Sequence, residues 1–117
     1  IPKIEVFQKF FNELKEAKSL GIRIAIGTGT RTANATRILK EKDLFDYIDA
    51  LVTADDVTRH KPNPDTFLVA AKRLELEPQD CLVFEDGQLG IKAALRGGFD
   101  CIEVKDNEMI NYFESDR

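Results

Sequence analysis

The sequence predicts an α/β domain in which a parallel sheet is flanked by helices. Short apolar runs alternate with amphipathic helical segments along the chain, and this alternation favours parallel strands joined by right-handed crossovers. Polar residues follow three of the predicted strands, at Thr28, Lys61 and Glu85. The 117 residues are expected to form one domain, because no repeat, low-complexity segment or linker divides residues 1–117.

The first two helices and the strand between them follow from the spacing of apolar residues and glycines. Residues 4–20 place apolar side chains at helical intervals, and Gly21 follows as a stop signal. Isoleucines at alternate positions predict a strand over residues 22–26, which breaks at the polar glycine loop 27–30. Helical character resumes over residues 32–40. A strand, a glycine loop and a helix in this order are typical of a phosphate cradle.

A turn, a second strand and a third helix come next. Residues 44–48 predict a turn that leads to a strand over residues 50–53. Residues 54–64 predict a polar loop that contains two prolines. Asp65 is expected to cap a helix that runs to about Leu74, because apolar residues recur at helical spacing behind it.

The last part of the chain predicts two strands and two helical segments. Residues 81–84 are expected to form a strand, and a short helix over residues 89–96 is stopped by two glycines. A further strand covers residues 101–104. Residues 108–113 predict a last helical turn or two.

Charge and composition argue against nucleic-acid and membrane partners. The net charge of −4 and the absence of a basic stripe interleaved with aromatic residues do not suit a nucleic-acid surface. The longest apolar run is far too short to span a bilayer. The first residues, Ile1 to Glu5, resemble neither a signal peptide nor a transit peptide.

The two cysteines favour a reduced, cytoplasmic protein. Cys81 and Cys101 both lie in apolar, strand-like runs, where a free thiol behaves as a small hydrophobic side chain. Two cysteines at this separation form neither a disulfide framework nor a metal-ligand spacing.

Two neighbouring carboxylates follow the strand in the last third of the chain. Val83 and Phe84 predict a buried strand, and Glu85 and Asp86 fall where it stops, at the edge where open α/β sheets place their ligands. Adjacent acids repel each other unless a cation or a proton lies between them, which favours a hard ion such as Mg²⁺. The alternative is that Glu85 starts a loop and Asp86 caps the next helix. This segment alone leaves both interpretations open.

The polar residues behind the three strands are expected to converge. The carboxyl ends of parallel strands share one edge, so Thr28, Lys61 and the two carboxylates would line one pocket. A hydroxyl, an ammonium and Mg²⁺ together suit phosphate chemistry. The two cations would neutralise phosphoryl oxygens, while the hydroxyl and nearby backbone N–H groups would donate hydrogen bonds to them.

Each member of this group also has a simpler interpretation. Thr28 on its own would be an ordinary cap or turn residue. Lys61 would be a solvated loop lysine, although Pro62 and Pro64 stiffen the loop and limit where the ammonium can point. His60 is interpreted as a surface or loop-packing residue rather than a general base.

Three segments of the chain together resemble one known family. Residues 24–30 (IAIGTGT), 60–65 (HKPNPD) and 83–91 (VFEDGQLGI) are similar to the second, third and fourth motifs of the haloacid dehalogenase superfamily. Within it the likeness is to β-phosphoglucomutase and the neighbouring sugar-phosphate phosphatases, including the fructose-1-phosphatase-like proteins. The resemblance extends from the first helix to the last strand.

The resemblance implies a role for each residue of the predicted pocket. Thr28 would hydrogen-bond the transferring phosphoryl group, and Lys61 would bridge that group to the nucleophile; these two are the implied catalytic residues. Glu85 and Asp86 would hold Mg²⁺. The implied phosphate-binding residues are Thr28, Gly29, Thr30 and Lys61. A loop that turns the lysine inward also implies a cis Lys61–Pro62 peptide bond.

The chain departs from the family pattern at its start. Family members begin with a strand that ends in Asp-x-Asp, whose first Asp is the nucleophile and whose second is the general acid/base, and a helical cap follows. This sequence contains neither. The resemblance therefore implies a partial Rossmann-like core whose central first strand, between the strands at 22–26 and 81–84, is absent. An N-terminal segment or another chain would supply that strand.

The function that follows is a Mg²⁺-dependent phosphatase or phosphomutase that acts on small sugar phosphates through an aspartyl-phosphate. The 117 residues alone would lack the nucleophile and be inactive. One alternative is a non-catalytic α/β binding or assembly module that keeps the anion pocket. A flavodoxin-like receiver domain is less favoured, because nothing before Asp43 provides the early acidic pair of such domains.

Overall fold

The computed structural model describes residues 8–106 and 108–115 as alternating helices and short strands. The strands are β1 (Ala25–Gly27), β2 (Ala50–Val52), β3 (Leu82–Glu85), β4 (Asp100–Lys105) and β5 (Glu108–Phe113). The helices are α1 (Gln8–Ser19), α2 (Thr32–Glu41), α3 (Asp65–Arg73) and α4 (Gln88–Arg96), with short 3₁₀ segments at Phe45–Tyr47, Ala54–Asp56 and Pro78–Asp80. The predicted α/β fold class is confirmed; residues 4–7 of the first predicted helix lie outside the described residues.

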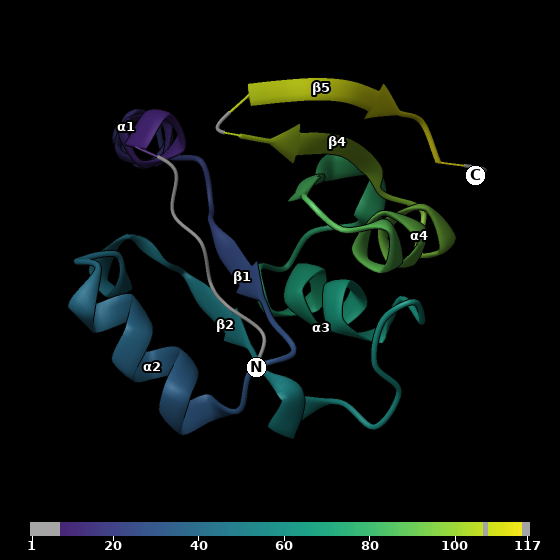
Figure 1. Ribbon diagram of the computed structural model, residues 1–117, viewed down its shortest axis with the longest axis horizontal. Helices are drawn as coiled ribbons and strands as arrows, with labels where there is room; N and C mark the ends of the chain where they lie inside the picture. Colours follow the sequence, from purple (N-terminus) through teal and green to yellow (C-terminus); the bar gives the residue numbers. More distant parts are fainter. Residues whose placement is uncertain (1–7, 107, 116–117) are drawn as a thin grey trace.

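The described strands form two separate sheets. β1 pairs with β2 in parallel, and β3 pairs with β4 in parallel. β5 joins the second sheet as an antiparallel edge strand next to β4 (Figure 1). No ladder joins β1 to β3 within residues 8–106 and 108–115, so each of these two strands has one side without a partner strand among the described elements.

The prediction of a helical turn over residues 108–113 was wrong, because this segment is strand β5. It pairs back on β4 from Lys105 opposite Glu108 to Cys101 opposite Phe113, with an irregularity in the register between Glu103 and Val104. Asp106 has a φ of 51°, the left-handed conformation that tight hairpin turns require. The Asp-Asn pair at 106–107 is a hairpin signal that the helical interpretation overlooked.

Helices α3 and α4 form one layer that spans both sheets. α3 packs on β1 and β2 and also contacts α4, which packs on β3 and β4 (Figure 1). The main core lies between these helices and the second sheet. Its buried members are Phe67, Ala71, Val83, Ile91, Ala93, Ala94, Phe99 and Cys101. Because no ladder joins the two sheets in the described part of the chain, this helical layer positions the carboxyl end of β1 relative to that of β3.

The expectation that Phe84 is buried was wrong. Val83 points into the core and is 9% exposed, whereas Leu82 and Phe84 on the opposite face of β3 are 44% and 48% exposed. Alternate residues of a strand point to opposite faces, and α3 and α4 cover only one of them. None of the helices among the described residues has the length and apolar character needed to cross a membrane.

Candidate functional site

The loop after β1 is packed tightly against the start of α3. A Cβ atom on Gly27 would lie 2.9 Å from Cγ2 of Thr66, so only glycine lets this strand approach the helix so closely. The next residue, Thr28, is buried, and its N–H donates to the carbonyl of Val52 on the neighbouring strand. Its Oγ1 accepts a hydrogen bond from the N–H of Thr30 at 3.1 Å. The loop is therefore fixed by backbone contacts on both sides.

The amino terminus of α2, which follows this loop, already binds a carboxylate of the same chain, that of Asp55. The N–H of Thr32 donates to Oδ2 of Asp55 at 2.9 Å, and Arg31 forms an ion pair with the same carboxylate. The hydrogen bonds from Thr32 lower the pKa of Asp55, so the group is ionised at neutral pH. The N–H of Gly29, in contrast, has no protein acceptor among the described residues. The N–H of Thr32 therefore has an acceptor already, that of Gly29 is open to an added anion, and the role of the loop in phosphate binding stays a prediction.

Lys61 lies between the carboxyl ends of β1 and β3. Its Nζ is 3.4 Å from the carbonyl oxygen of Gly27, the last residue of β1, and 3.2 Å from Oε2 of Glu85, the last residue of β3. The ammonium also lies 4.7 Å from the centre of the Phe67 ring, within range of a cation–π contact. Both partners of the ion pair are largely buried, with side-chain exposures of 22% for Lys61 and 16% for Glu85. The expected cis conformation of Lys61–Pro62 is confirmed.

Glu85 is held from three directions. Oε2 accepts from Lys61, and Oε1 accepts from the N–H groups of Asp86 and Gly87 at 3.2 and 3.4 Å. The carboxylate rests on the first turn of α4, where Gly90 leaves room for it. These contacts bend the side chain back over its own backbone and toward Lys61.

Asp86 is exposed, and no described residue bonds to its carboxylate. No group of three or more His, Cys, Asp or Glu side chains that could hold a metal occurs among the described residues. Mg²⁺ requires several oxygen ligands in near-octahedral geometry, and Glu85 already has partners for both of its oxygens. The carboxylates therefore suit Mg²⁺ chemically, but they form only part of a coordination sphere.

The structure brings together some of the predicted site residues. Lys61 and Glu85 are in direct contact, and Lys61 also contacts the residue before Thr28. Asp86 follows Glu85 and is exposed. The roles of Thr28, Gly29, Thr30, Lys61, Glu85 and Asp86 in catalysis, phosphate binding and metal binding remain predictions.

Sequence reasoning missed two supporting contacts. Arg59 and Asp65 form a bidentate ion pair that closes the loop around Lys61. Asp55 caps α2 from a segment 23 positions away. Charges at the two ends of a proline-rich loop were the available signal for the first contact, whereas the second depends on a long-range approach that no local pattern reveals.

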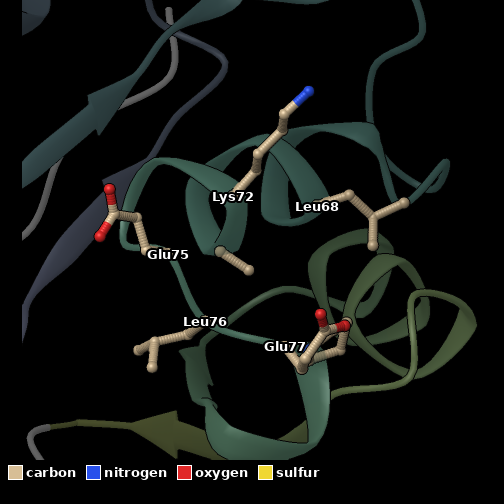
Figure 2. A pocket seen from close by; sticks show the side chains of 7 residues that line it. Leu68, Lys72, Glu75, Leu76 and Glu77 are labelled. Carbon is tan, nitrogen blue, oxygen red and sulfur yellow. The ribbon is translucent and has the colours of Figure 1, made fainter.

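A shallow hollow elsewhere on the surface involves none of these residues. It lies toward the carboxyl end of α3, where Leu68 and Lys72 project from the helix and Leu76 and Glu77 follow it (Figure 2). Lys61, in contrast, precedes the amino end of the same helix. The hollow is therefore separate from the candidate site.

Comparison with known proteins gives one consistent result. The sequence pattern of the haloacid dehalogenase-like hydrolases matches residues 3–98. The chain is 46% identical over 82 residues to the fructose-1-phosphate phosphatase YqaB of Escherichia coli K12, covering 70% of this chain and 44% of that protein. It is 36% identical over 89 residues to a phosphorylated carbohydrates phosphatase of Thermotoga maritima, covering 76% of this chain and 41% of that protein.

The fold comparison agrees with the sequence comparison. The crystal structure of β-phosphoglucomutase from Clostridium difficile is similar with a TM-score of 0.80 at 28% identity, over 86% of this chain and 44% of that one. The chain spans less than half the length of each of these three proteins. The chain belongs to the haloacid dehalogenase-like hydrolases, in the branch that contains β-phosphoglucomutase and the fructose-1-phosphatase-like proteins.

Proposed function

We propose that this chain is the phosphate- and metal-binding part of a Mg²⁺-dependent phosphatase or phosphomutase that acts on small sugar phosphates through an aspartyl-phosphate. The observation that carries the proposal is the position of Lys61. Its ammonium lies between the carboxyl ends of two parallel strands that do not pair with each other. The similarity to sugar-phosphate phosphatases supports the substrate class.

Lys61 would neutralise charge on the transferring phosphoryl group. Its present acceptors are a carbonyl and a carboxylate, and an incoming phosphoryl oxygen is an acceptor of the same kind with more negative charge. The hydroxyl of Thr28 and the N–H of Gly29 would donate further hydrogen bonds from the loop next to it. Donors that are already in place cost little reorganisation when charge develops on the phosphoryl oxygens.

Mg²⁺ would be held by Asp86, with Glu85 as the weaker ligand. The exposed Asp86 carboxylate is open to an ion, whereas Glu85 would have to share an oxygen with Lys61. The remaining ligands would come from water, substrate and residues outside this chain. When bound, the ion supplies positive charge that offsets the charge of the phosphoryl oxygens.

The nucleophilic aspartate would come from a strand placed between β1 and β3. A parallel strand that pairs with both would bring its carboxyl end to the edge where Lys61 lies. An aspartate at that end would be within reach of a phosphoryl group bound by the ammonium. In this proposal the 117 residues on their own are inactive because they bind phosphate without a nucleophile to receive it.

The two thiols fit the cytoplasmic location proposed for the protein. Cys81 and Cys101 are both free. A reducing compartment keeps such thiols in the reduced form.

The test uses the whole protein and a series of sugar phosphates, with released inorganic phosphate as the readout. Lys61→Met should lower kcat/KM by about 10²- to 10³-fold, the range seen when one charge-stabilising group is removed. Lys40→Met is the matched control. Lys40 also lies over an aromatic ring, that of Phe45 at 5.0 Å, but far along the chain from the site, so its loss should change kcat/KM less than about twofold.

Metal dependence and the non-catalytic alternative are tested in the same assay. Chelation with EDTA should abolish phosphate release, and added Mg²⁺ should restore it. Full activity of Lys61→Met or of the chelated enzyme would contradict the proposal. Lys61-dependent binding of inorganic phosphate, with no turnover of any sugar phosphate, would instead favour a binding module that keeps the anion pocket.

A further inference from the structure

The loop that carries Lys61 is closed on its outer side by a two-point ion pair. Nε of Arg59 donates to Oδ2 of Asp65 at 3.0 Å, and Nη2 donates to Oδ1 at 2.9 Å. Two parallel hydrogen bonds between a guanidinium and a carboxylate fix their orientation as well as their distance. Because Asp65 is the first residue of α3, the pair attaches the start of the loop directly to that helix.

The inner part of the loop is fixed by weaker contacts. The backbone N–H and the side-chain amide of Asn63 both donate to the carbonyl of His60, at 3.0 and 3.1 Å. Arg96 of α4 approaches the carbonyl of Pro62 at 3.4 Å. These contacts shape the turn around Lys61, but among the described residues it is the Arg59–Asp65 pair that joins the two ends of the loop.

The exposure of Arg59 argues against a main role of this pair in stability. The Arg59 side chain is 67% exposed, although that of Asp65 is only 22% exposed. Solvent screens an ion pair with one exposed partner, so its contribution to the free energy of folding is small even where bidentate geometry strengthens it. A long lysine side chain, in contrast, can adopt many conformations, so the place of its ammonium depends on how firmly its backbone is held. The bidentate geometry suits a positioning role.

We propose that Arg59 is a positioning residue that, through its two-point contact with Asp65, holds the ammonium of Lys61 between the carboxyl ends of β1 and β3. This role has two consequences. Arg59 fixes the place of the Lys61 ammonium, which can be tested without any activity. Arg59 also affects catalysis, and this second consequence rests on the proposed phosphatase or phosphomutase function. An ammonium displaced by about 1 Å can lower a rate by as much as about 10²-fold.

The first experiment measures the rate at which an amine-reactive acylating reagent modifies each lysine of the whole protein, read by mass spectrometry. In the wild type Lys61 should react slowly, because it is mostly buried and has two acceptors. Arg59→Ala should raise the rate at Lys61 several-fold while leaving that at the exposed Lys92 unchanged. Arg37→Ala, which removes another exposed arginine from an ion pair with Glu41, is the matched control and should change neither rate.

Arg59→Lys separates positioning from charge. Lysine keeps the positive charge opposite Asp65 but cannot form the two-point contact. If the geometry matters, this variant should resemble Arg59→Ala in the labelling rate at Lys61. Labelling at the wild-type rate in Arg59→Lys, or in both variants, would overturn the proposal. A loss of thermal stability only slightly larger than that of Arg37→Ala should accompany the effect, since solvent screens the Arg59–Asp65 pair through the exposed Arg59.

The second experiment measures kcat/KM of the same variants with a sugar phosphate that the wild type hydrolyses. The kcat/KM of Arg59→Ala and of Arg59→Lys should be about tenfold below that of the wild type, mainly through kcat. The kcat/KM of Arg37→Ala should stay within about twofold of the wild-type value. Increased labelling of Lys61 together with an unchanged kcat/KM would overturn the catalytic consequence. A wild type that hydrolyses nothing would contradict the proposed function alone and leave the labelling result to decide the positioning role.

Discussion

A Cβ atom at Gly90 would lie 2.0 Å from Cδ of Glu85, a separation that real structures do not tolerate. The same Cβ atom would lie 2.1 Å from Oε2 of Glu85, the oxygen that accepts a hydrogen bond from Lys61. Glycine inside a helix normally destabilises it by about 0.5–1 kcal/mol relative to alanine. Its presence in α4 is explained here by the space that the Glu85 carboxylate occupies on the first turn of that helix.

Gly90→Ala should therefore change the site more than the fold. The atoms in its way belong to a flexible side chain, which can rotate away and leave α4 in place. The gain in helix propensity should offset part of the lost Lys61–Glu85 contact, so the change in unfolding free energy should stay within about 1 kcal/mol. A crystal structure of the variant should show the Glu85 carboxylate beyond 4 Å from Nζ of Lys61.

Gly97→Ala is the matched comparison at the other end of α4. Its Cβ would lie 2.9 Å from the ring of Phe99, which is 2% exposed and cannot rotate out of the core. Overpacking of this kind costs about 1–3 kcal/mol, so this variant should unfold more easily. If Gly90→Ala were the less stable of the two, or kept the ion pair intact, our account of Gly90 would be wrong.

Much of the fold could be predicted because it depends on local patterns. Alternating isoleucines predicted a strand over residues 22–26, which overlaps β1 (Ala25–Gly27) only at its last two positions, and helical spacing after Asp65 indicated α3. Residues 108–113 were misassigned because their polar residues, Glu108 and Asn111, recur at a spacing of three, which is close to the helical period, and the pairing with β4 that makes the segment a strand is not contained in the segment itself. Phe84 was wrongly expected to be buried because burial depends on which sheet face the helices cover, and a strand's own sequence does not contain that information.

The candidate site was predictable only as far as topology dictates it. The contact between Lys61 and Glu85 follows from the rule that carboxyl ends of parallel strands share an edge. The contacts that shape each side chain could not be predicted. Asp55 on the amino terminus of α2 and the fit of Glu85 against Gly90 both depend on how separate elements approach in space.

Asp86 should contribute more to Mg²⁺ binding than Glu85. No described residue competes for its carboxylate, whereas Glu85 is bonded to Lys61 and to two backbone N–H groups. In calorimetric titrations of the whole protein, Asp86→Ala should weaken Mg²⁺ binding at least about tenfold and by more than Glu85→Gln does. Asp80→Ala removes an exposed acid at the opposite, amino end of β3 and serves as the control. Identical binding by the wild type and Asp86→Ala would refute the assignment.

Cys101 should behave as a thiol of unusually high pKa. Burial, and to a lesser degree the charges of Glu85 and Glu103, raise its pKa to about 11. Below that value the thiolate fraction rises tenfold for each pH unit. Because Cys101 is fully buried and no reagent reaches it in the native protein, the test is an ultraviolet titration of the Cys81→Ser variant, in which the thiolate signal of Cys101 should still rise steeply from pH 8 to pH 10. The unfolded protein is the control, since an exposed thiol of ordinary pKa approaches a plateau in this range. A native signal that levels off below pH 10 would contradict the assigned cause.

The unpaired sides of β1 and β3 lead to a prediction about the 117 residues in isolation. Each of these strands pairs with only one other described strand, and the two sheets are linked through α3 and α4. A buried backbone group without a hydrogen-bond partner costs roughly 1–3 kcal/mol, and several such groups would lie along the two strands. Against a typical folding free energy of about 5–15 kcal/mol, this loss is enough to unfold a small domain.

We therefore expect residues 1–117, expressed alone, to unfold in urea without a steep transition or with a free energy below about 5 kcal/mol. A synthetic peptide of alternating apolar residues, long enough to pair with both strands, should raise that value in proportion to the logarithm of its concentration. The same peptide with proline at two central positions is the control, because it cannot complete a ladder. A cooperative transition of the monomeric chain above about 5 kcal/mol, unaffected by either peptide, would show that the fold is complete without an additional strand and that the architecture we infer for the site is wrong.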